Sequence, residues 1–172
     1  MAQAYQGDIA ESIAGTPRAG QLAENTGPDK LRSGVVADVL VAPGKLVCPG
    51  SAAGKYKTPT SAAEVLTSFG VSAFLPLKSD SVSPLNQEDY QIGEPLLYLE
   101  KGEIWVQVEA AVAEGQQALY RHTANGGGGF PTVGLWRGDA NTGAGVVPAC
   151  RFTSATAGAG FARVRLNLPA TA

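Results

Sequence analysis

Histidine and cysteine are scarce in this chain of 172 residues, and their scarcity limits the chemistry it can perform. A serine–histidine–acid triad would have to use the single histidine, His122, and no serine lies in a Gly-x-Ser-x-Gly turn. Cys48 and Cys150 are too few for a disulfide scaffold, and each lies in an apolar run. We expect two buried thiols, with a disulfide between them as the alternative. The sequence predicts no enzyme, no metal and no cofactor.

Charge is also low, since Asp, Glu, Lys and Arg make up 16% of the residues, against about 25% in a typical soluble domain. Either the surface is rich in small polar residues, or much of it is buried in an assembly. The net charge of −2 gives no reason to expect nucleic-acid or anionic-membrane partners. No apolar run approaches the roughly 20 residues of a membrane span, and Met1 leads into polar sequence without a signal peptide. We therefore expect synthesis in a cytoplasm.

The charges that are present are unevenly distributed. Residues 1–120 carry eight basic and fourteen acidic groups, whereas the chain from Arg121 onward carries five arginines and a single acidic residue, Asp139. This asymmetry indicates complementary faces, either within one subunit or between subunits.

The stretch from Tyr98 to His122 has the clearest structural pattern. Residues 96–99 are apolar, and Lys101-Gly102 is expected to form a turn. Residues 103–108 then alternate, which is typical of a half-buried strand. Residues 110–113 are expected to form a short helical insert that Gly115 ends, and residues 117–121 to form the next strand. This is an antiparallel arrangement suited to packing.

Turn signals divide the rest of the chain into short segments. Ser61 and Glu64 form a capping box before an apolar run, which predicts one short helix ending at Gly70. Further strands are expected over 35–41, 45–48, 71–77, 133–137, 146–153 and 161–168. About eight short strands with turns every 8–12 residues predict an all-β domain over residues 35–172, either a β-sandwich or a barrel.

Residues 1–34 differ from the rest because they are rich in Gly, Ala and polar residues and have few apolar groups. We expect an extended N-terminal arm, with at most one helical turn, that docks on a partner. Its candidate interface residues are the apolar anchors and a central Pro-Arg pair, namely Tyr5, Ile9, Ile13, Pro17, Arg18 and Leu22. Trp105, Trp136 and Arg137 are further interface candidates, because Trp and Arg are enriched in protein interfaces; either tryptophan could instead cap the core.

Three motifs suggest ligand chemistry but have simpler explanations. Gly126–Gly129 lacks the following helix and lysine of a phosphate loop, which favours a flexible hairpin loop. Asp139 and Asn141 could bind calcium, but the other acidic ligands are missing, which favours a solvent-facing turn. Glu88-Asp89 and Glu94 flank a proline-containing loop without an aromatic platform, so a solvated loop is favoured over a glycosidase pair.

The segment YLEKGEIWVQVEAAVAEGQQALYRH resembles the central part of phage structural cement proteins, which decorate tailed-phage capsids. Lys101, Gly102, Trp105 and Val106 match a K-G-x-[IV]-W-V stretch, and residues 111–115 match an A-V-A-x-G step. The similarity continues through the segments 134–137, 139–140, 148–152 and 164–169, and through Gly7-Asp8 and Pro17-Arg18 near the start. It covers most of the chain and is loose between residues 50 and 90.

This resemblance implies a single β-sandwich domain of jelly-roll type. It also implies a capsid cement protein on the outer surface of the virion, bound to the major capsid protein and bridging adjoining capsid subunits. It also implies contacts with copies of itself, as a dimer or trimer at symmetry axes, and no catalysis or cofactor. Two alternatives remain from the residues alone. One is a carbohydrate-binding or adhesin-type β-sandwich module, which requires exposed aromatics, although only 7% of the chain is aromatic. The other is a hydrolase that relies on His122.

Overall fold

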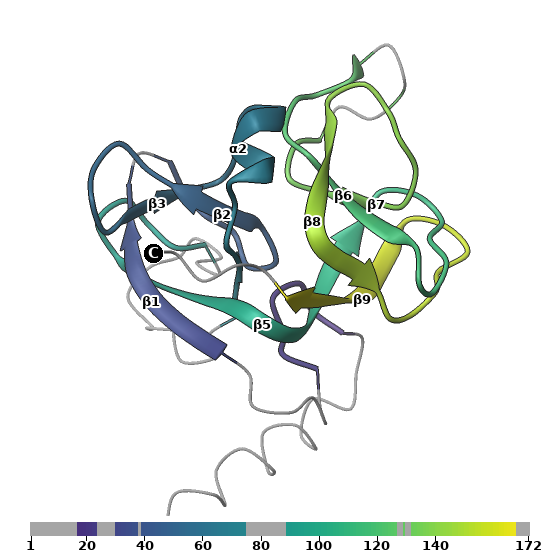
Figure 1. Ribbon diagram of the computed structural model, residues 1–172, viewed down its shortest axis with the longest axis horizontal. Coiled ribbons are helices and arrows are strands. Elements are labelled where there is room, and N and C mark those ends of the chain that lie inside the picture. Colours follow the sequence, from purple (N-terminus) through teal and green to yellow (C-terminus); the bar gives the residue numbers. More distant parts are fainter. Residues whose placement is uncertain are drawn as a thin grey trace, which may run out of the picture.

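The computed structural model describes residues 17–23, 30–37, 39–74, 89–126, 129 and 132–167. Within these ranges it has nine strands and one short helix (Figure 1). The elements are β1 (Lys30–Val36), β2 (Leu46–Pro49), β3 (Lys55–Lys57), α2 (Ala62–Leu66), β4 (Gly70–Ser72), β5 (Pro95–Val108), β6 (Gln117–Arg121), β7 (Trp136–Arg137), β8 (Ala144–Phe152) and β9 (Gly160–Asn167). The all-β class predicted from the sequence is confirmed.

All nine strands belong to one sheet that closes on itself at two places. The strand order is β1-β3-β2-β4-β5-β7-β6-β8-β9, with β1 also paired to β5 and β9 also paired to β5. One ring is therefore β1-β3-β2-β4-β5 and the other is β5-β7-β6-β8-β9. Figure 1 shows β5 running from the first ring to the second. The strand pattern allowed a sandwich or a barrel, and the structure shows a barrel-like closed sheet in place of the jelly-roll sandwich that the resemblance implies, because one long strand serves both rings.

A bulge in β5 allows this sharing. Leu31 pairs with Leu99 and Lys30 pairs with Lys101, which leaves Glu100 as an extra residue in β5. An extra residue reverses which side of the strand the following side chains occupy. The expected turn at Lys101-Gly102 is therefore wrong. The strand continues, and Gly102 takes a φ of 134°, which favours glycine, where β5 changes its partner from β1 to β9.

The fold has two apolar clusters, and the larger one also takes in Leu46 of β2 and Val71 of β4. The first cluster contains Val36, Val41, Val47, Phe69, Tyr90, Leu96 and Tyr98, with Tyr56 packed against it. The second is larger and includes Leu99, Ile104, Val106 and Val108 from β5, together with apolar residues of β6, β8 and β9. The alternation predicted for residues 103–108 is confirmed, since Ile104, Val106 and Val108 are all buried.

The local predictions have mixed outcomes. The helix begins after Ser61, whose hydroxyl accepts a hydrogen bond from the Glu64 N–H at 3.3 Å, but it ends at Leu66 rather than Gly70. The strand over 117–121 is confirmed. The helical insert over 110–113 is wrong, because Val112 pairs with Thr156 in an isolated antiparallel bridge. The first strand begins at Lys30 rather than residue 35, since β5 offers it a pairing edge.

Among the described residues, no helix is long and apolar enough to cross a membrane.

Candidate functional site

Residues 17–23 of the predicted arm lie along an edge of β5 in their own chain. The Gly20 N–H donates to the Trp105 carbonyl at 2.7 Å, the Trp105 N–H donates to the Gln21 carbonyl at 2.8 Å, and the Ala23 N–H donates to the Glu103 carbonyl at 3.0 Å. Leu22 forms an antiparallel bridge with Ile104 and packs against the larger apolar cluster. We call residues 17–23 the arm root, because they anchor the predicted arm to the sheet.

Gly20 is the tightest point of the arm root. Its carbonyl also accepts from the Phe74 N–H at 2.7 Å, so the residue joins β5 to the segment after β4. Its φ is +78°, and a Cβ there would lie 2.7 Å from the Pro43 Cβ. Both the backbone conformation and the space require glycine. The exposed Arg18 lies beside this point, with its guanidinium carbon 5.6 Å from the centre of the Phe74 ring.

The outer face of β5, β9 and β8 carries a group of basic side chains. Directly opposite residues of antiparallel strands point to the same side of a sheet. The register pairs Lys101 with Asn167, Glu103 with Arg165, and Trp105 with Arg163 between β5 and β9, and it pairs Arg165 with Arg151 between β9 and β8. We define the arginine face as Lys101, Arg151, Arg163 and Arg165, together with Trp105 and Glu103.

Glu103 is the one carboxylate on the arginine face, and two arginines share it. The Arg165 Nη2 lies 2.7 Å from one carboxylate oxygen of Glu103, and the Arg163 Nη1 lies 3.8 Å from the other. Arg163 also lies over the Trp105 ring, 5.7 Å from its centre. Trp105 is half-buried, so the predicted interface residue stands at the edge of this face.

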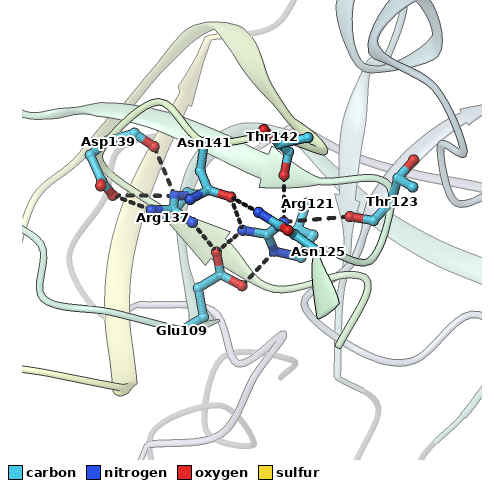
Figure 2. A network of polar contacts seen from close by, with 8 residues as sticks. All are labelled: Glu109, Arg121, Thr123, Asn125, Arg137, Asp139, Asn141 and Thr142. Atoms are coloured by element: carbon cyan, nitrogen blue, oxygen red, sulfur yellow. Dashed lines mark hydrogen bonds and ion pairs between the residues drawn. The ribbon is translucent and has the colours of Figure 1, made fainter. Parts of the chain in front are cut away.

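A second group of ionic side chains is buried at the ends of β5, β6 and β7, on the side of the sheet away from the larger apolar cluster (Figure 2). Arg121 is fully buried and binds Glu109 through two hydrogen bonds, Nε to Oε2 and Nη2 to Oε1, both of 2.7 Å. The Arg137 Nη1 donates to the same Oε1 at 2.7 Å. One carboxylate therefore holds two arginines in the interior. Such a network is stable only when its donors are satisfied.

The loop over residues 139–142 supplies the remaining acceptors. Arg137 binds the Asp139 carboxylate at 2.8 Å, and Arg121 donates to the Asn141 side-chain oxygen at 3.2 Å and to the Thr142 carbonyl at 2.9 Å. The oxygens considered for calcium thus accept hydrogen bonds from guanidinium groups. In the described ranges, no cluster of three or more His, Cys, Asp or Glu residues could hold a metal ion.

The other predicted site residues fall into three groups. Trp136 and Arg137 are buried, at 0% and 2% exposure, and the Trp136 indole N–H donates to the Gly44 carbonyl at 2.8 Å. Trp136 packs in the larger apolar cluster and Arg137 binds Glu109, so both side chains are used within the subunit. Pro17 and Leu22 are half-buried in the arm root. Tyr5, Ile9 and Ile13 lie outside the described residues.

The single histidine and the two cysteines have local partners or are buried. The His122 Nδ1 lies 2.9 Å from the Thr123 hydroxyl, at a half-buried position on the strand end. Cys48 and Cys150 are free and buried, which confirms the expected thiols. Burial raises the pKa of Cys48 to about 12 and also raises the pKa of Cys150. Neither thiol is prepared to act as a nucleophile near neutral pH.

A family model described as structural cement protein (E217 gp24/Pam3 gp6) matches residues 1–167. The chain belongs to the phage structural cement protein family. This confirms the resemblance seen in the central segment and the capsid-associated structural class that it implies. Membership of a structural family argues against an enzyme.

A solved structure agrees with the fold of this cement protein. A chain of "The capsid of Myoviridae Phage XM1" is similar with a TM-score of 0.65 and 18% identity, over 89% of this chain and 92% of that one. At this identity the likeness concerns the fold. No curated protein matches the chain.

The sequence did not predict that Arg121 and Arg137 are buried around Glu109. Glu109, Arg121 and Arg137 each follow the last apolar residue of a strand, Val108, Tyr120 and Trp136 respectively. A charged residue directly after a buried strand residue is the sequence feature that could have indicated a buried ionic cluster. Only the pairing of β7 with both β5 and β6 brings the three charges together.

Proposed function

We propose that this protein is a capsid decoration protein that binds the outer surface of the shell formed by the major capsid protein and bridges adjoining capsid subunits. The family match over residues 1–167 is the observation that carries the proposal. A protein that binds only the assembled shell stabilises it by its binding free energy. Many copies on one lattice multiply this effect.

An exposed apolar group at one end of the first ring is the candidate capsid contact. Val39, Leu40 and Ile92 are 47%, 50% and 58% exposed. Two hydrogen bonds between Val41 and Tyr90 and one from the Gly93 N–H to the Val36 carbonyl hold the two loops side by side. Neighbouring exposed apolar side chains are typical of a protein-binding surface. We call Val39, Leu40 and Ile92 with their two loops the apolar loop pair, and we propose that it contacts the major capsid protein.

The arm supplies the second contact. Its root is anchored to β5, so residues 1–16 leave from a fixed point on the sheet. Tyr5, Ile9 and Ile13 would then dock on a neighbouring subunit, and bridging would follow. Association of copies as a dimer or trimer at a symmetry axis is part of the same proposal.

The test is attachment to undecorated capsids, followed by heating. Co-sedimentation should saturate, and decorated capsids should disrupt at a higher temperature than undecorated ones. A variant that lacks residues 1–16 should attach at least about tenfold more weakly, as expected when apolar anchors are lost. Unchanged capsid melting at saturation would contradict the cement function. No observation favours the carbohydrate-binding alternative, since no aromatic side chain among the described residues is exposed.

A further inference from the structure

The arginine face has more positive charge than the acidic side chains of the described residues neutralise. Lys101, Arg151, Arg163 and Arg165 share one sheet face with Glu103. Lys30, directly opposite Lys101, is already paired with Glu100 at 2.8 Å. Glu103 is 6% exposed and already engaged by two arginines. Arg151 donates one hydrogen bond to the Gly115 carbonyl at 3.0 Å, and no acidic partner of Lys101 or Arg151 is found in the described part of the chain.

The register makes this arrangement unfavourable within one subunit. Arg151 and Arg165 are directly opposite each other on β8 and β9. Like charges in directly opposite positions destabilise a sheet. Where a chain departs from a local rule of this kind without compensation inside the fold, the compensation is expected from a partner.

We propose that the arginine face binds residues 1–16 of a second copy of this chain. That segment carries Asp8 and Glu11 and has no Lys or Arg, so its side-chain charge complements the face. Its apolar groups can contact Trp105, while its carboxylates accept from the arginines in charge-assisted hydrogen bonds. This inference rests on the proposed bridging between copies, and it names the surface that receives the arm.

The chain length is sufficient for the contact. Sixteen extended residues span up to about 50 Å, well beyond the width of a three-strand face. The arm root fixes where each segment starts, because Gly20 and Ala23 are hydrogen bonded to β5. The arm of each copy would then bind the arginine face of a neighbouring copy. The affinity of each contact would fall as the salt concentration rises, because the contact depends on charge.

Zero-length cross-linking of the full chain tests the contact. A carbodiimide converts the Asp8 or Glu11 carboxylate to an O-acylisourea. The Lys101 amine attacks the acyl carbon, an amide forms, and the carbodiimide portion leaves as its urea. Copies of natural isotope content are mixed with ¹⁵N-labelled copies, both free at high concentration and bound to capsids. We expect peptides that join a light arm to a heavy Lys101 and the reverse. Lys55, an exposed lysine on β3 of the other ring, is the internal control and should link far less.

Charge reversal adds a second readout. Arg151→Glu should lower the Lys101 link about tenfold, the scale of removing one or two ion pairs and adding repulsion. Lys55→Glu is the matched control and should leave the link unchanged. A partner copy with Glu11→Arg, which keeps Asp8 for the chemistry, should restore the link to Arg151→Glu. Circular dichroism and the unfolding midpoint verify that each variant folds.

Several outcomes would overturn the inference. These are links confined to peptides of one isotope, a Lys101 link no stronger than that of Lys55, and an Arg151→Glu variant that links like the wild type. The proposed function fails separately, if the wild-type protein does not sediment with capsids. Mixed-isotope links between free copies would then still support the arm-to-face contact.

Discussion

Arg121 and Glu109 form a bidentate ion pair in the interior, with both hydrogen bonds at 2.7 Å and side-chain exposures of 0% and 3%. The same carboxylate also binds Arg137 at 2.7 Å. Removing one partner of a buried pair leaves a charge without compensation, and this costs more than the pair itself contributes. The two buried guanidinium groups therefore share one buried carboxylate.

We expect Glu109→Gln to destabilise the protein strongly, because two buried guanidinium groups lose their shared negative charge. The predicted loss in free energy of unfolding is about 3–5 kcal/mol. Urea denaturation of the variant and of Glu114→Gln, a control at an exposed position five residues away, measures it. A loss of less than about 1 kcal/mol relative to the control would show that the cluster is not held in this way.

Gly20→Ala should release the arm root from β5. The substitution meets a φ of +78° and a Cβ contact of 2.7 Å with Pro43, whereas Gly54→Ala meets a φ of +73° with no atom within 4 Å. The control variant Gly54→Ala therefore has only the strain of an alanine at positive φ, about 1–2 kcal/mol. Hydrogen exchange of the Trp105 amide, which donates to Gln21, should speed up at least about tenfold in Gly20→Ala alone. Equal exchange in both variants would contradict the assigned role of Gly20.

Glu64 should make stability depend on pH in the acid range. Hydrogen bonds from Lys57 and then from the Thr60 N–H lower the pKa of Glu64 from 4.5 to about 2. A carboxylate with a depressed folded pKa stabilises the protein above its unfolded pKa, and this contribution is lost as the pH falls from about 4.5 to about 2.

The test compares urea unfolding of the wild type and Glu64→Gln at pH 7 and at pH 2. We expect the wild type to be more stable at pH 7 by about 1 kcal/mol, because the pair is partly exposed to solvent. The difference should nearly vanish at pH 2. A difference that stays constant with pH would mean that the Glu64 charge is not the cause.

Both thiols should be unreactive in the folded protein. Burial raises the pKa of Cys48 to about 12, so little thiolate exists at pH 8, and Cys150 is buried as well. A thiol-specific reagent should modify both residues within minutes in urea and neither one at a comparable rate in buffer. Fast modification without denaturant would show that the core opens readily.

Ile92→Asp should weaken attachment to capsids and leave folding intact, because the side chain is 58% exposed. We expect at least about a tenfold loss of affinity, the effect of placing a charge in an apolar contact. Leu66→Asp is the matched control, at 60% exposure on α2. Equal losses from both substitutions would remove the apolar loop pair from the proposed interface.

Elements fixed by local chemistry were predictable from the sequence. Ser61 and Glu64 predict the helix start because the cap is a contact between residues three apart. The alternation over residues 103–108 predicts the buried face of β5 because a strand has a period of two. Residues 117–121 were placed correctly for a similar reason, since turn signals limit the strand on both sides.

Features that depend on distant pairing were not predictable. The pair Lys101-Gly102 is typical of a turn. The strand stays extended there because β5 pairs first with β1 and then with β9. Residues 110–113 suit a helix, but Thr156 pairs with Val112. The two ring closures and the Glu109 cluster also follow from register between strands far apart in the sequence, which periodicity does not reveal.

The most direct test of the central claim is a cryo-electron microscopy reconstruction of undecorated capsids after incubation with the purified protein. The account predicts added density on the outer surface, with each copy contacting at least two adjoining capsid subunits and residues 1–16 reaching a neighbouring subunit. Capsids without added density, or copies that each contact a single subunit and no neighbour, would contradict it.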